Sequence, residues 1–181
     1  HRTAFEPDLC YPDFTDVWMP HPIDSRGKPN IWRQSNILTH SPTDRFKKRS
    51  EFIFKVFELL PECDIRIIEG LDHREAIRQR KESTIFFDQF RVGFYGNSAI
   101  EAMQYGIPVG CYLSTPAKEQ ARGALDNCPV LTEMLSAYHW AEMIKRTLDS
   151  DMYDLSCRTK SWCNRVHSYE SVAKKWINYY K

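Results

Sequence analysis

Residues 84–113 read TIFFDQFRVGFYGNSAIEAMQYGIPVGCYL, and their pattern guides the interpretation of the whole chain. Thr84–Asp88 and Pro108–Leu113 are apolar runs of strand length. A glycine-rich turn follows the first run and leads into an expected helix over Ser98–Tyr105. Gly106 fits the left-handed position that commonly ends a helix. A strand, a helix and a strand in this order predict a βαβ unit with parallel strands.

The same alternation continues on both sides of this stretch. Further strands are expected at residues 37–40 and 64–69, with a short fifth strand within 127–131. The expected helices cover 47–60, 73–81, 137–148 and 153–180, and one more begins at Thr115-Pro116. Strands of a parallel sheet are covered on both faces, which explains apolar runs in place of alternation. The sequence therefore predicts an α/β fold, a doubly wound parallel sheet with a C-terminal helical segment.

The first 36 residues have a different character. They contain five prolines and show no sustained periodicity, apart from one short strand candidate at Asp16–Met19. We interpret 1–36 as an interdomain linker segment and 37–181 as the ligand-binding domain. Because the chain begins at His1 and nothing near it resembles a signal peptide, we expect a fragment or processed chain.

Composition excludes several classes of function. Apolar residues make up 42% of the 181 residues and charged residues 27%, which is ordinary for a soluble globular protein. The formal net charge of +1 lacks the basic excess of a duplex-binding module, so we expect no nucleic-acid partner. No window is long and apolar enough to predict a transmembrane segment.

The six cysteines are scattered, with no CxxC pair and no Cys/His spacing typical of zinc. We therefore expect no structural metal. Three disulfides and six free thiols both remain open from the count alone. In a domain of this size with an aliphatic core, free thiols in a reducing compartment are favoured, which predicts a cytoplasmic location.

Basic residues gather where the strand 37–40 meets the next helix. The candidates in this region are His40, Ser41, Thr43, Arg45, Lys47, Lys48 and Arg49. Cations at a strand-to-helix junction suit an anion, because a helix N-terminus carries partial positive charge. The alternative is a solvated basic first turn, and the sequence leaves both open.

A second candidate site follows the strand 84–88. Asp88 and Gln89 end the strand, and Gly93 and Gly96 permit close approach of a ligand to the backbone. The amides of Asn97, Ser98 and Ala99 would point at a diphosphate above the helix. Glu101 lies three residues after Ser98, which is also the spacing of a capping box, so a purely structural role for Glu101 stays open.

Other motifs are absent. The chain has no GxGxxG fingerprint, no GxxxxGK[ST] loop and no GxSxG elbow. His73, His139 and His167 are isolated, and we expect surface or capping roles for them.

Taken in order, the motifs resemble the C-terminal, nucleotide-sugar-binding domain of GT-B glycosyltransferases of the group 1, retaining type. The matching pieces are His40-Ser41-Pro42-Thr43, Ile67-Ile68-Glu69-Gly70, Asp88-Gln89, Gly93-Phe94-Tyr95-Gly96 and the stretch from Glu101 to Val109. The resemblance covers about Val17–Lys181, and Glu101–Val109 is its most specific part.

The resemblance implies roles at matching positions. Arg45 and Lys48 match the basic pair that binds the donor diphosphate, with Lys47 as an alternative one residue away. Glu101 matches the second Glu of the family's Glu-x7-Glu motif, which holds the donor ribose. The first Glu, which usually contacts the donor sugar, is replaced by Gly93. Asp88 and Gln89 lie near this position and are the candidates to take its place.

The implied function is transfer of a sugar from a nucleotide-sugar donor to an unknown acceptor. An N-terminal acceptor-binding domain of the same protein would be the partner, and the chain alone would be inactive. The resemblance implies no cofactor, and the sequence assigns no catalytic residue. A non-catalytic nucleotide or nucleotide-sugar binding module of the same fold is the alternative, because fold alone does not determine function.

Overall fold

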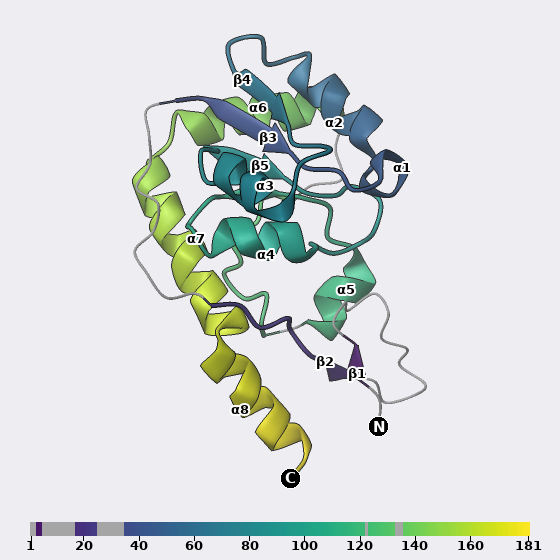
Figure 1. Ribbon diagram of the computed structural model, residues 1–181, viewed down its shortest axis with the longest axis vertical. Helices are drawn as coiled ribbons and strands as arrows, with labels where there is room; N and C mark the ends of the chain where they lie inside the picture. The colour runs from purple at the N-terminus through teal and green to yellow at the C-terminus, as the bar shows by residue number, and fades with distance from the viewer. Residues whose placement is uncertain (1–2, 5–16, 25–34, 122, 133–135) are drawn as a thin grey trace.

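The computed structural model describes residues 3–4, 17–24, 35–121, 123–132 and 136–181. Within them, a parallel sheet has the strand order β4-β3-β5-β6 (Figure 1). Its strands are β3 (Ile37–His40), β4 (Asp64–Ile67), β5 (Ile85–Phe87) and β6 (Val109–Gly110). The predicted parallel α/β sheet is confirmed, although three of the strands are shorter than expected.

The strand order creates a switch point at the middle of the sheet. Within this sheet, β3 comes first along the chain and β4 pairs with one side of it. The chain then returns, and β5 pairs with the other side of β3. Connections therefore leave β3 and β5 in opposite directions. In open α/β sheets, ligands bind outside the carboxyl ends of the strands at such a point.

Helices cover both faces of the sheet (Figure 1). Ile85 and Phe87 of β5 pack with α2 (Ser50–Phe57) and α6 (Ala137–Leu148). Phe86 points to the opposite face, where α4 (Asn97–Met103) and α7 (Met152–His167) pack. This alternation follows from the two-residue period of a strand. The sheet is thus doubly wound, as predicted.

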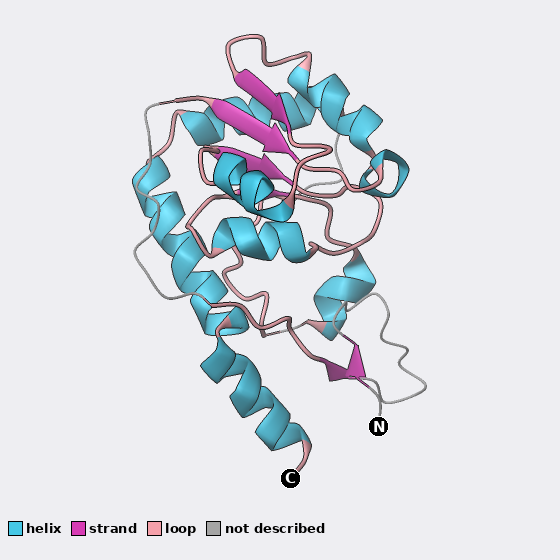
Figure 2. Cartoon of the chain, in the orientation of Figure 1, coloured by secondary structure: helices cyan, strands magenta, loops and turns pink. Residues whose placement is uncertain are grey.

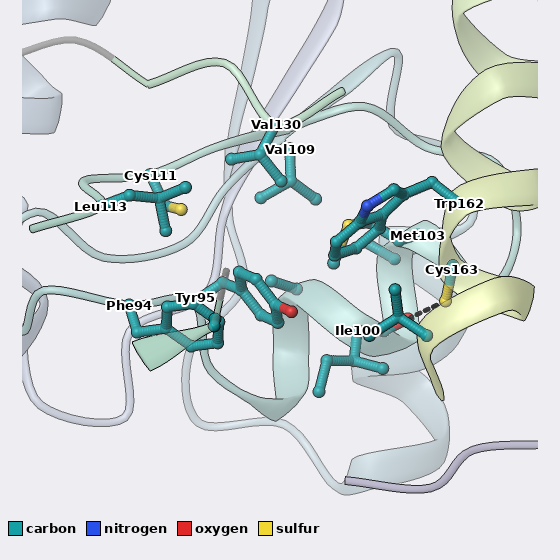
Figure 3. Packing of buried hydrophobic residues seen from close by; sticks show 14 of the residues in the cluster. Phe94, Tyr95, Ile100, Met103, Val109, Cys111, Leu113, Val130, Trp162 and Cys163 are labelled. Atoms are coloured by element: carbon teal, nitrogen blue, oxygen red, sulfur yellow. Dashed lines mark hydrogen bonds between the residues drawn. The ribbon is translucent and has the colours of Figure 1, made fainter. Parts of the chain in front are cut away.

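The core on the α4 face joins the glycine turn to the C-terminal helices. Tyr95 packs edge-on against Trp162 of α7, with ring centroids 5.8 Å apart (Figure 3). Met103 and Val109 are buried in the same cluster. Cys163 donates a weak hydrogen bond from Sγ to the Ile100 carbonyl at 3.8 Å.

The helix expected over 47–60 is two helices. α1 (Arg45–Lys48) is followed by Arg49, whose φ of 55° places it in the left-handed region, and α2 then begins at Ser50. A non-glycine residue rarely adopts this conformation. The break lets the Lys48 carbonyl accept a hydrogen bond from the Phe90 amide at 3.1 Å, and the Lys48 side chain is buried.

The helix expected over 153–180 is also two helices. α7 ends at His167, Ser168 is extended with ψ of 151°, and α8 (Tyr169–Tyr179) follows. Ser168 Oγ accepts a hydrogen bond from the Ser171 amide at 3.2 Å, which caps α8. α8 extends beyond the rest of the domain (Figure 2).

The described part of the predicted linker packs against the domain. β2 (Val17–Trp18) pairs in parallel with β1 (Thr3–Ala4), so the strand expected near 16–19 is present, although Asp16 lies outside the described residues. Trp18 is buried against Phe94, with ring centroids 5.5 Å apart. The Ile23 amide donates to the His167 carbonyl at 2.8 Å. The domain boundary at residue 36 stays a prediction.

The remaining elements match the sequence with small shifts. α3 (His73–Arg80) and α6 begin where they were expected. α5 (Thr115–Gln120) is capped by Ser114, one residue before the expected Thr115. The expected fifth strand is a single parallel bridge between Gly110 and Leu131.

Candidate functional site

A buried ion pair lies at the switch point of the sheet. Lys48 ends α1, which follows β3, and Asp88 follows β5. Lys48 Nζ donates to Asp88 Oδ1, and the two side chains are only 11% and 0% exposed. The other oxygen, Asp88 Oδ2, accepts the Gly96 amide at 2.5 Å. One carboxylate therefore holds a lysine and the start of α4 together.

Gly96 keeps the space beside this pair open. A Cβ on Gly96 would lie 3.4 Å from Asp88 Oδ2 and 3.5 Å from Lys48 Nζ. Its φ of −94° is accessible to any residue, so backbone strain does not explain the glycine. The glycine instead leaves out a Cβ that would contact both the ammonium group and the carboxylate.

The amides predicted to meet a diphosphate lie at the start of α4. Gly96 is the N-cap, and no side chain caps this helix. The Ala99 amide already donates to the Gly96 carbonyl at 3.0 Å, whereas the first amides of a helix, here Asn97 and Ser98, have no intrahelical acceptor. The capping-box interpretation of Ser98 and Glu101 is wrong, because Ser98 is not the N-cap.

Glu101 is paired with α3 instead. Its Oε2 accepts from Nη1 of Arg80, whose side chain is 5% exposed, and Glu101 itself is 22% exposed. His73 Nε2 lies 3.7 Å from Oε1. Glu101 is therefore held by Arg80 of α3, lies near His73 and remains partly accessible.

Arg45 does not pair with Asp88; its partner is Glu69. It is 60% exposed and donates to both oxygens of Glu69, at 2.9 and 2.6 Å. This interaction lowers the pKa of the Glu69 carboxyl. The structure thus joins Lys48, and not Arg45, to Asp88 and Gly96. A diphosphate role for Arg45, in which it shares its guanidinium with Glu69, stays a prediction.

Gln89 and Gly93 shape the loop before α4. Gln89 is buried, and its side-chain amide donates to the Phe94 carbonyl. A Cβ on Gly93 would lie 2.5 Å from the Cβ of Ser114, far closer than atoms can approach. Position 93 therefore admits no side chain unless Ser114 moves. The glycine at position 93 is therefore part of this packing.

His40 is buried and links β5 to the start of α2 through two hydrogen bonds. Its Nδ1 donates to the Phe87 carbonyl at 2.8 Å, because a carbonyl can only accept. Nε2 then accepts from Ser50 Oγ at 2.8 Å. Burial lowers the pKa of His40 to about 4, so the ring is neutral at neutral pH.

His167 departs from the sequence expectation. It is buried, donates from Nδ1 to the His21 carbonyl at 2.8 Å, and accepts the Tyr95 hydroxyl at Nε2 at 2.9 Å. Burial lowers its pKa to about 4. The expectation of a surface or capping role was wrong for His167. The same expectation agrees with the position of His139, which is exposed and whose Nδ1 lies 2.8 Å from the hydroxyl of Ser136, the N-cap of α6.

A pocket of about 190 Å³ connects part of the candidate site to the linker segment. The residues that line it are His21, Pro22, Ile23, Asn97, Ile100 and Glu101. Two of the predicted site residues, Asn97 and Glu101, therefore face one pocket, whose other wall is the described part of the linker segment. The linker wall gave no chemical signal in the sequence.

Five of the six cysteines lie in the described part of the chain. Cys63, Cys111, Cys128, Cys157 and Cys163 are free, which excludes three disulfides; Cys10 lies outside the described residues. Burial raises the pKa of Cys128 and Cys163 to about 12.

Within the described ranges, no group of three or more His, Cys, Asp or Glu side chains is arranged to hold a metal ion. Among the described helices, none combines the length and apolar composition that crossing a bilayer requires.

No family model matches the chain, and no curated protein sequence matches it. Solved structures do. A mutant of S. aureus TarM, in complex with fondaparinux, α-GlcNAc-glycerol and UDP, gives a TM-score of 0.70 at 17% identity, over 90% of this chain and 39% of that one. HepE from Anabaena, in complex with UDP and glucose, gives a TM-score of 0.64 at 8% identity, over 91% of this chain and 56% of that one. Sucrose-phosphate synthase from Thermosynechococcus elongatus gives 0.61 at 14% identity, over 91% and 52%.

These solved structures are GT-B glycosyltransferases, and this chain spans between 39% and 56% of their length. At such low identity the likeness concerns the fold. It agrees with the strand order, the helices on both faces and the switch point described above. The chain therefore has the Rossmann-like α/β fold of one half of a GT-B glycosyltransferase.

Proposed function

We propose that the chain is the donor-binding, C-terminal half of a retaining glycosyltransferase that uses a nucleotide sugar. The observation that carries the proposal is the Lys48–Asp88–Gly96 cluster at the switch point of a GT-B fold. Similar folds were solved with UDP in TarM and HepE, and with UDP and GlcNAc in a pneumococcal O-GlcNAc transferase. UDP is therefore the first nucleotide to test.

In this proposal the diphosphate binds beside Lys48, in the space that Gly96 leaves open. The amides of Asn97 and Ser98 are the nearest backbone donors, because they start α4. Glu101 accepts hydrogen bonds from the ribose hydroxyls in the adjoining pocket. Lys48 and Asp88 cancel each other's charge, so a second cation is needed to balance the diphosphate. Arg45 is the predicted source of that cation.

Catalysis requires the acceptor to be held against the donor. The chain spans about half of the solved relatives' length, and we assign acceptor binding to another half of the same protein. Proximity and orientation cannot be achieved without that half. We expect no sustained sugar transfer by the chain alone, a cytoplasmic location and no cofactor. Repeated turnover by the purified chain would contradict the first of these expectations.

The contact between Gly93 and Ser114 favours a second candidate function. Position 93 is a glycine, and Ser114 would have to move before a side chain could fit there, so the usual glutamate contact to the donor sugar is missing. Asp88 is committed to Lys48 and Gly96, and Gln89 to Phe94. A module that binds the nucleotide without transferring the sugar would tolerate this loss. Such a module would bind UDP and its sugars with similar affinity, whereas a transferase donor site would prefer the sugar.

Calorimetric titration with UDP-, GDP-, ADP- and TDP-sugars tests the proposal. Removing Lys48 alone would leave Asp88 charged and unpaired in the interior, which is strongly destabilising. The informative variant is therefore Lys48→Met combined with Asp88→Asn, which removes both charges. We expect it to weaken binding of the preferred nucleotide by about tenfold or more, as for one lost charge-assisted hydrogen bond.

The matched control is Lys145→Met, on α6. Lys145 is 42% exposed and pairs with Glu142 on the surface. It should leave nucleotide affinity unchanged. Equal affinity for all three proteins would contradict the assignment of the site, and absence of binding by every nucleotide tested would contradict the proposed function.

A further inference from the structure

Arg80, the last residue of α3, is an arginine in an interior position. Its Nη1 donates to Glu101 Oε2, and its Cζ lies 5.1 Å above the centroid of the Phe86 ring. Its Nε is buried and has no acceptor among the described residues. The guanidinium therefore lies between the sheet and the carboxylate, with part of its hydrogen-bonding capacity unused.

Stability alone does not explain this arginine. Burying a guanidinium removes its hydration, and a buried N–H without an acceptor adds to the cost. Replacing a buried ion pair by apolar groups is often neutral or stabilising. A methionine at position 80 would pack on Phe86 without either cost, and the partly exposed Glu101 could then be hydrated.

The guanidinium does fix the orientation of Glu101. Oε2 is held by Arg80, while Oε1 lies 3.7 Å from His73 Nε2. Glu101 also lines the pocket between α4 and the linker segment. An oriented carboxylate can accept hydrogen bonds from two adjacent hydroxyls, whereas a mobile one must first lose side-chain entropy.

We propose that Arg80 is a positioning residue, which holds the Glu101 carboxylate ready to accept the ribose diol of the nucleotide. This inference rests on the proposed function. Arg80 itself does not touch the ligand. It sets the selectivity of the site for a ribonucleotide over a nucleotide that lacks the 2′-hydroxyl.

The test compares the dissociation constants of UDP and 2′-deoxy-UDP, measured by calorimetry. The ratio of the two constants reports only the hydroxyl, because the base and the diphosphate are the same in both ligands. A change in the folded fraction affects both constants equally and leaves the ratio unchanged. We expect the wild-type chain to prefer UDP by about tenfold or more, as for a hydrogen bond to a charged group.

Arg80→Met should reduce this preference to about twofold or less. Arg80→Gln should also reduce it, and this second variant replaces the first if the methionine variant does not fold. Arg78→Met is the matched control, since Arg78 lies on the same helix and pairs with Glu75 and Glu82 on the surface. It should keep the wild-type preference. In a Glu101→Gln background, Arg80→Met should have no further effect on the ratio.

The outcomes separate the two claims. If the wild-type chain binds none of the four nucleotides tested above, the proposed function fails; if it prefers another ribonucleotide to UDP, the same comparison is made with that nucleotide and its 2′-deoxy form. If it binds UDP but does not prefer it over 2′-deoxy-UDP, or if both Arg80 variants keep the preference, the positioning role is overturned and the donor site stands.

Discussion

Acidification should unfold this domain in a way that depends on His167. The unfolded chain has a histidine pKa of 6.5, and burial lowers the pKa of His167 to about 4 in the folded protein, although the hydrogen bond to the His21 carbonyl acts in the opposite direction. A lowered folded-state pKa means that protons bind more tightly to the unfolded chain. The stability contributed by the neutral ring is present above pH 6.5 and is lost as the pH falls toward 4.

The size of the effect follows from the two pKa values. Between about pH 7 and pH 5, the linkage relation gives a loss of about 2 kcal/mol in the free energy of unfolding for His167. His40 has the same shift for the same main reason, burial, so the two together give about 4 kcal/mol. Comparison with a variant that lacks the histidine separates its contribution from every other pH-dependent contribution.

His167→Gln is the variant that isolates one of these contributions. Glutamine keeps a donor for the His21 carbonyl and an acceptor for the Tyr95 hydroxyl, and it does not titrate. Urea unfolding followed by tryptophan fluorescence at the two pH values gives the loss for each protein. The loss should be about 2 kcal/mol smaller in His167→Gln than in the wild type. His139→Gln, at an exposed position, should lose as much as the wild type. Equal losses in the wild type and His167→Gln would refute the account of the buried neutral ring.

Three further outcomes follow from the site. Lys48→Ala should lower the free energy of unfolding by about 3 kcal/mol or more, and adding Asp88→Asn should restore much of it, as measured by urea unfolding. Gly96→Ala should change stability by less than about 1 kcal/mol, because its Cβ meets only ordinary contacts, yet weaken UDP binding in calorimetry by filling the space beside Lys48. Gly93→Glu should cost about 2 kcal/mol or more through overlap with Ser114, and Ser114→Gly should relieve part of that cost in the same unfolding assay.

The sequence predicted the architecture well because its signals are local. Short apolar runs such as Ile85–Phe87 alternate with helices, which indicates βαβ units, and a parallel sheet covers such runs on both faces. The broken helices could not be predicted in this way. Nothing at Arg49 or Ser168 resembles a glycine or proline break, and tertiary hydrogen bonds to Phe90 and Ile23 flank these positions.

The candidate site was predicted in part. The sequence indicated Lys48, Asp88 and Gly96 separately, and the structure shows that one carboxylate joins the other two. It could not show that Glu101 pairs with Arg80, because the partners are 21 residues apart on different helices. The spacing of Ser98 and Glu101 within one helix was compatible with a capping box, but Glu101 instead pairs with Arg80 of α3.

The most direct test of the account is a crystal structure of the chain with UDP bound. We expect the diphosphate within about 3 Å of Lys48 Nζ and beside Gly96, with the ribose hydroxyls on the Glu101 carboxylate. UDP bound elsewhere, for example between Arg158 and Arg165 in the pocket beside Trp162, would contradict it.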